Sequence, residues 1–109
     1  MAELDSANTP GTTVELLSVD DGSALVKIGG EVDMKTISEL EAAVEPILSG
    51  NPARLVVNVS GVSFADSSAI ALWVRWANRI RQVEIYEPSV LIRRVITRMG
   101  LAERLRMTP

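Results

Sequence analysis

The sequence predicts a single α/β domain, a four-stranded mixed sheet with helices packed against it. Short β-branched runs alternate with segments whose apolar residues recur at helical spacing, which is typical of a sheet covered by helices. One strand–helix–strand unit, residues 55–86, has the length of a crossover between parallel strands. Of the 109 residues, 47% are hydrophobic and 23% charged, the balance of one globular core. We expect the domain to span residues 12–107 and residues 1–11 to form a flexible arm.

The first elements of the domain are predicted to be a β-hairpin. Strand-like runs at 12–19 and 23–28 flank an Asp-Asp-Gly turn at 20–22. Two glycines then end the second run, and the following connection leads to a helix.

The first helix is predicted to begin at a capping box. Thr36 and Glu39 form the T-x-x-E pattern, and apolar residues then recur at helical spacing up to Gly50. Pro46 lies inside this pattern at a cost of about 3 kcal/mol, so the last turn should kink or end early.

The second half of the domain is predicted to contain two strands and two helices. In the helix at 67–80, Ile70, Val74 and Ala77 should form the buried stripe, bordered by Trp73 and Ile80. Around this helix we expect a buried strand at 55–59, a strand at 83–86, a third helix from Ser89 to an αL cap at Gly100, and one more turn within 101–107.

The composition excludes most catalytic chemistry. The sequence has no cysteine and no histidine, so thiolate nucleophiles, imidazole bases, disulfides and nearly all zinc sites are excluded. The glycines lack the spacing of nucleotide-binding loops. We therefore predict that the chain is not an enzyme and holds no cofactor and no metal. A signal peptide and a long apolar run are also missing from the sequence, which predicts a cytoplasmic location.

The charge is distributed unevenly along the chain. Residues 1–66 carry 3 basic and 11 acidic side chains, and residues 67–109 carry 8 basic and 3 acidic ones, giving net charges of −8 and +5. The arginines are spread through apolar periodic segments instead of forming a solvated basic block, so direct binding of nucleic acid is not predicted. We expect the two halves to attract each other in the fold.

The first candidate site is the junction before the second helix, residues 64–69, with Asp66-Ser67-Ser68 at its centre. Aspartate and serine oxygens accept hydrogen bonds from the free N–H groups at a helix N-terminus, so capping alone explains one of these residues. The second serine favours a further role. A phosphate on Ser67 would be stabilised by the helix N-terminus and would change the charge of the surface, not its shape.

The second candidate site is Asp33, in the connection before the first helix. Two interpretations are open: Asp33 is free if Thr36 is the helix cap, or it is an alternative cap on a glycine turn.

The combination of these segments resembles a known family. The elements GEVD at 30–33, FADSSA at 64–69 and MGL at 99–101, with a third helix that begins Pro-Ser-Val, resemble the STAS domain family and, within it, the bacterial anti-sigma factor antagonists. The resemblance covers about residues 12–106. The Asp-Ser-Ser element is its most specific part.

The resemblance implies a partner-switching role in transcription regulation. In that family, the unphosphorylated antagonist binds an anti-sigma factor that is also a serine kinase and so frees a sigma factor. Phosphorylation of the serine directly after the aspartate, here Ser67, prevents binding, and a serine phosphatase restores it. ATP belongs to the kinase. The implied partner-binding residues are Asp33, Asp66, Ser67 and Ser68.

The sequence departs from the family pattern at three places. Ala69 replaces a usual glycine, the connection at 80–83 lacks a glycine turn, and Trp73 and Trp76 replace smaller aliphatic residues. Trp76 lies off the predicted buried stripe. It is either an exposed interface anchor or a side chain packed under the third helix.

A second function in the same family stays open. A STAS module that is never phosphorylated would use the same surface as a scaffold or an accessory subunit of a transporter or signalling complex.

Overall fold

A five-stranded mixed sheet organises residues 11–20 and 22–109, which the computed structural model describes. β1 pairs antiparallel with β2, and β2 to β5 run parallel in the order β1-β2-β3-β4-β5. The predicted mixed α/β fold is confirmed. Except for Gly11, the predicted arm at 1–11 lies outside the described residues. The elements are β1 (Thr12–Asp20), β2 (Ser23–Val32), α1 (Ile37–Ser49), β3 (Arg54–Ala65), α2 (Ser67–Arg79), β4 (Gln82–Tyr86), α3 (Val90–Arg98) and β5 (Leu105–Thr108).

A fifth strand follows the turn predicted within 101–107. Gly100, at a φ of 73°, ends α3 in a Schellman motif, in which the Gly100 and Leu101 amides donate to the carbonyls of Thr97 and Ile96. The αL cap at Gly100 is thereby confirmed. After a short turn, Leu105 is buried and Arg106 exposed, the alternation of a strand at the edge of a sheet. The predicted turn is present, because the Leu105 amide donates to the Leu101 carbonyl at 2.8 Å, but it leads into a strand that the sequence did not predict. The sheet therefore has one strand more than expected.

The helix α1 tolerates its proline. It runs through Pro46 to Ser49, so the prediction of an early end is wrong. Leu40, Val44 and Leu48 are buried along one side, and their packing against the sheet outweighs the hydrogen bond that proline cannot donate. None of the helices that the structure describes is long and apolar enough to cross a membrane.

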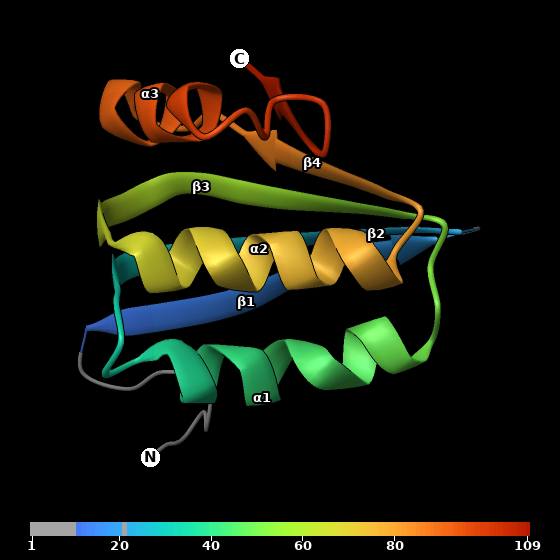
Figure 1. Cartoon of the computed structure of the whole chain (residues 1–109). Helices are drawn as coiled ribbons and strands as arrows, with labels where there is room; N and C mark the ends of the chain where they lie inside the picture. The colour runs from blue at the N-terminus through green and yellow to red at the C-terminus, as the bar shows by residue number, and fades with distance from the viewer. Residues whose placement is uncertain (1–10, 21) are drawn as a thin grey trace.

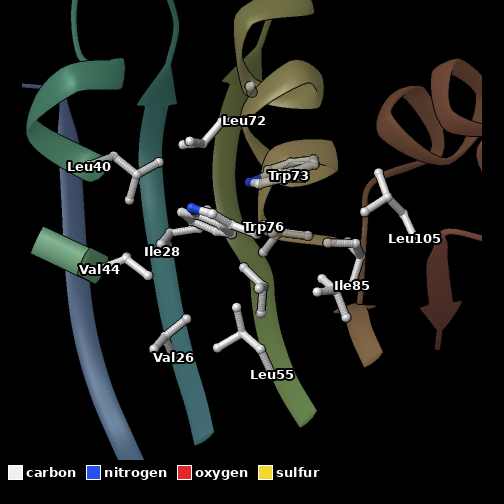
Figure 2. Close-up of a cluster of buried hydrophobic side chains, with 14 of the residues drawn as sticks. Val26, Ile28, Leu40, Val44, Leu55, Leu72, Trp73, Trp76, Ile85 and Leu105 are labelled. Carbon is white, nitrogen blue, oxygen red and sulfur yellow. The ribbon is translucent and has the colours of Figure 1, made fainter. Parts of the chain in front are cut away.

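The core lies between the sheet and the helices, and two tryptophans of α2 fill its centre. Trp73 and Trp76 are 0% and 2% exposed, and Figure 2 shows both indoles among the strand side chains. Trp76 is therefore not an exposed interface anchor. It lies in Figure 2 near Ile28, over the sheet and not under α3.

The buried side of α2 differs from the stripe predicted for it. Ile70 is buried as expected, but Val74 and Ala77 are only half-buried and lie at the flank of the core. The helix is rotated so that its largest side chains fill the space over the sheet. The buried residues of α2 are Ala69, Ile70, Leu72, Trp73 and Trp76.

The topology brings the starts of two helices together. α1 and α2 lie side by side in front of the strands in Figure 1, and α3 lies beyond them next to β4. β2 and β3 are parallel and end at paired residues, Val32 and Ala65. The connections that follow them therefore leave the same edge of the sheet, which is the edge where both candidate sites lie.

The face of the sheet opposite the core carries an ion pair. Glu84 lies between the core residues Val83 and Ile85, so its side chain points to the other face, yet the residue is only 6% exposed. Arg54 of β3 donates to both carboxylate oxygens at 2.8 and 2.9 Å. This bidentate hydrogen bonding holds the pKa of Glu84 below its ordinary value of 4.5, against the opposing effect of burial.

The Glu84 ion pair predicts a pH-dependent stability. Because the pKa is lower in the folded chain than in the unfolded chain, the stabilisation is present above the ordinary pKa and is lost as the pH falls through the folded value. We expect Glu84→Gln to lower the free energy of unfolding at neutral pH, and we expect its difference from wild type to shrink as the pH is lowered from 7 to about 3. Urea denaturation at both pH values measures this. The control is Glu15→Gln at an exposed position of β1, and an equal pH dependence in both variants would contradict the prediction.

Candidate functional site

The two loops that carry the candidate residues are joined by Asp66. Its amide donates to the carbonyl of Val32 at 3.2 Å, and its Oδ2 accepts a hydrogen bond from the Met34 amide at 3.3 Å. The connection between β2 and α1 is thus attached to the start of α2. The two candidate sites, far apart in sequence, form one surface.

Asp66 is also the N-cap of α2. It has an extended backbone, and its Oδ1 accepts from the Ser68 amide at 2.8 Å. The carboxylate therefore satisfies one free N–H group of the helix with one oxygen and holds the neighbouring loop with the other. The capping interpretation of Asp66 is correct, and it places the next residue at the first position of the helix.

Ser67 is that first residue of α2. It is exposed, and its hydroxyl makes no hydrogen bond with any of the described residues. Ser68 is half-buried, and its amide is taken by Asp66. Ser67 is the more exposed of the two serines, and it stands at the positive end of the helix dipole.

The carboxylate of Asp33 is hydrogen-bonded, whereas it was expected to be free if Thr36 capped the helix. Its Oδ1 accepts from the amides of Lys35 and Thr36 at 2.9 and 3.2 Å. The Thr36 hydroxyl does not cap α1, because it accepts from the Asp33 amide and donates to the Glu31 carbonyl. The T-x-x-E capping box is therefore not formed. Asp33 is not free, but it does not cap α1 either, because its carboxylate closes the turn before the helix and accepts from no amide of α1.

Gly30 gives the loop its path. Its φ is +80°, and a Cβ atom there would collide with the carbonyl oxygen of Gly11. Only glycine combines this backbone conformation with so close an approach of another chain segment. The Gly-Glu-Val-Asp element is thus explained by backbone geometry at its first position and by turn closure at its last.

A groove of about 300 Å³ lies beside Ser67 and has a mainly apolar lining. One wall comes from the end of β3 and the start of α2, including Phe64, Ser67 and Ile70, and the other comes from the first turns of α3, including Leu91 and Ile92. An apolar groove with a few polar groups at its rim is typical of a binding site.

Exposed apolar side chains lie in and near this groove, and two of them, Met34 and Leu91, were not part of the site predicted from the sequence. Met34, Phe64 and Leu91 are 75%, 50% and 61% exposed. Phe64 and Leu91 line the groove, while Met34 belongs to the loop held by Asp66. Such exposed side chains favour contact with another protein. For Met34 the usable signal in the sequence was position, because it directly follows Asp33.

The geometry fits a binding surface and a modification site. Among the described residues no group of three or more potential metal ligands occurs. The site offers the accessible hydroxyl of Ser67, two aspartates engaged in loop and helix hydrogen bonds, and an apolar groove.

Comparison with known proteins identifies sequence relatives. The family model described as "Mlab, STAS domain" matches residues 16–109. The anti-sigma-F factor antagonist RsfB of Mycobacterium tuberculosis is 28% identical over 103 residues, which are 92% of this chain and 84% of that protein. An anti-sigma-B factor antagonist of Staphylococcus aureus is 35% identical over 57 residues, covering 52% of this chain and 53% of the relative.

Solved structures share the fold. An anti-sigma factor antagonist from Mycobacterium paratuberculosis superposes with a TM-score of 0.82 at 24% identity, covering 94% of this chain and 90% of the other. The antagonist SpoIIAA in its unphosphorylated form gives 0.73 at 19% identity, covering 89% of each chain. At these identities the similarity establishes the architecture alone.

Proposed function

Because this chain belongs to the STAS domain family, we propose that it is an anti-sigma factor antagonist controlled by phosphorylation of Ser67. In this proposal the unphosphorylated chain binds an anti-sigma factor that is also a serine kinase, and a sigma factor is released. Phosphorylation ends the binding, and a serine phosphatase restores it. The chain contributes a binding surface and a phosphate acceptor, and the kinase contributes ATP and catalysis.

One observation carries the proposal: an accessible serine occupies the first position of α2, at the rim of an apolar groove. The helix N-terminus stabilises a phosphate at this position through its dipole and free N–H groups. The fold therefore needs no rearrangement to accept the modification. Its surface, in contrast, gains a charge of about −1.5 to −2 at neutral pH.

The effect of this charge on binding follows from its surroundings. Asp66 precedes Ser67 directly, and Asp33 belongs to the loop that Asp66 holds. A partner docked over the groove would shield these groups from water, so a phosphate would be buried among like charges beside apolar side chains. Such a cluster costs several kcal/mol. Phosphorylation is therefore expected to abolish docking without unfolding the chain.

The names of the two sequence relatives support this assignment, because both proteins are described as antagonists of anti-sigma factors. A structure of SpoIIAA in its phosphorylated form superposes with a TM-score of 0.69, so a protein of this fold accepts a phosphate.

The test is phosphorylation by the cognate kinase. Wild-type chain, Ser67→Ala and the matched control Ser68→Ala are incubated with the purified anti-sigma factor kinase and ATP, and their intact masses are measured. Wild type and Ser68→Ala should each gain one phosphoryl group, because Ser67 is the exposed hydroxyl, and Ser67→Ala should gain none.

Modification at Ser68, or no modification of the wild type, would contradict the proposal. The second result would favour the other family role, a STAS subunit that is never phosphorylated and serves as a scaffold or as an accessory subunit of a transporter or signalling complex.

A further inference from the structure

The exposed side of α3 carries a concentration of arginines without ion-pair partners among the described residues. Arg93, Arg94 and Arg98 are exposed, and none of them forms a salt bridge there. Arg75 and Arg79 of α2 differ, because they contact Glu41 and Glu45 of α1 at 3.7 and 2.7 Å. The positive charge of α2 is thus used within the fold, and that of α3 is available to another molecule.

Helical geometry connects these arginines to the groove beside Ser67. Leu91, Arg94 and Arg98 are three and four residues apart, so they lie on one side of α3. Leu91 lines the groove together with Ser67 and is 61% exposed. We call the line Leu91, Arg94 and Arg98 the α3 ridge. It begins at the rim of the groove and extends along the helix away from it.

The charge of the surrounding surface indicates the kind of occupant. α3 carries three arginines and no acidic residue, whereas Asp66 lines the opposite wall of the groove and Asp33 belongs to the loop that Asp66 holds. A nucleic acid or an anionic membrane, negative throughout, would be repelled by these aspartates while bound to the arginines. A protein surface can present apolar groups to the groove and acidic groups to the ridge separately, which is the arrangement that matches both parts.

We infer that the α3 ridge is a second part of the docking surface and binds an acidic patch on the anti-sigma factor kinase. This inference rests on the proposed function, since it assigns an additional contact to the same partner. Complementary charges at the rim of an interface mainly raise the association rate and make it sensitive to salt. The ridge would thus speed encounter, and the Ser67 region would control whether the complex forms.

The experiment compares two double variants that remove the same charges from different helices. Arg94→Gln with Arg98→Gln neutralises the ridge, and Arg75→Gln with Arg79→Gln neutralises the paired arginines of α2. Association with the purified, immobilised kinase is followed by surface plasmon resonance at about 50 mM and about 500 mM NaCl. Circular dichroism spectra verify that both variants are folded.

We expect the ridge variant to associate on the order of 10-fold more slowly than wild type at low salt, with a much smaller difference at high salt. The control variant should stay within about 2-fold of wild type, because its arginines are occupied inside the fold. Equal rates for wild type and the ridge variant, or equal slowing of both variants, would overturn the inference.

Two further measurements distinguish a protein from a lipid or RNA as the occupant of the ridge, and the ridge contact from the Ser67 switch. Wild type and the ridge variant are each tested for binding to phosphatidylglycerol vesicles and to a single-stranded RNA at physiological salt. Binding of either ligand by wild type but not by the ridge variant would overturn the assignment to a protein partner. Phosphorylation of Ser67 in the ridge variant, given saturating kinase, should be complete. If the ridge effect is present but Ser67 is never phosphorylated, the proposed switch fails and the ridge contact stands.

Discussion

Replacing Ser67 by aspartate is expected to weaken binding to the anti-sigma factor kinase at least about 100-fold relative to replacing it by alanine. The aspartate places a fixed negative charge next to Asp66 at the rim of an apolar groove. Docking would remove this charge from water beside the carboxylate of Asp66, whereas alanine adds no charge there. Isothermal titration calorimetry with the purified kinase measures both affinities.

The matched control for this pair is Ser60→Asp. Ser60 is an exposed serine of β3, and the burial pattern of that strand places it outside the core. The control adds the same charge to the chain and should bind like wild type, which separates a local effect from a change in net charge. Equal affinities of Ser67→Ala and Ser67→Asp would mean that charge at the start of α2 does not control docking.

Truncating Trp76 to alanine is expected to lower the free energy of unfolding by about 3–5 kcal/mol. The indole is 2% exposed and lies over the sheet in the centre of the core (Figure 2), so its removal leaves a cavity that the strands cannot close. Trp76→Phe should cost much less. It keeps an aromatic ring and removes an indole N–H that has no hydrogen-bond partner among the described residues.

Urea denaturation followed by far-ultraviolet circular dichroism is the suitable measurement, because the variants change the tryptophan fluorescence itself. A loss of less than about 1 kcal/mol for Trp76→Ala would be typical of a surface position and would contradict the buried placement.

The fold was predictable from the sequence where one pattern dominated. The hairpin of β1 and β2 and the start of α3 followed from turn and cap residues, and the structure places them within a few residues of the predicted bounds. β5 was missed because a four-residue strand after a turn has too short an alternation to be recognised. β3 is longer than predicted because Ser60, Gly61 and Ser63 interrupt its apolar run.

The orientation of α2 was wrong for a different reason. Its apolar residues occupy most positions, so two neighbouring stripes fit helical spacing almost equally well. Choosing between them requires the shape of the space above the sheet, which is filled by Trp73 and Trp76 and not by Val74 and Ala77. This information lies in the tertiary packing and not in the local pattern.

The candidate site was predictable in its parts but not in its hydrogen bonds. That Asp33 and Asp66 lie at the same edge of the sheet follows from the parallel pairing of β2 and β3. The side chains of Asp33 and Thr36 are two possible caps three residues apart, and they bond within the turn before α1 instead of capping it, which no sequence rule decides. The link from Asp66 to the other loop uses a backbone amide, which has no sequence signature.

That backbone link has a consequence for how such a surface can evolve. Asp66 accepts its hydrogen bond from the backbone amide of Met34. The side chain of Met34 takes no part in this bond and is 75% exposed. Most substitutions at position 34 would therefore preserve the loop while changing the group presented to a partner, whereas a change at Asp66 would loosen both the loop and the helix start. A lineage can thus acquire a new partner by mutating one position while the structure that supports the serine is inherited unchanged.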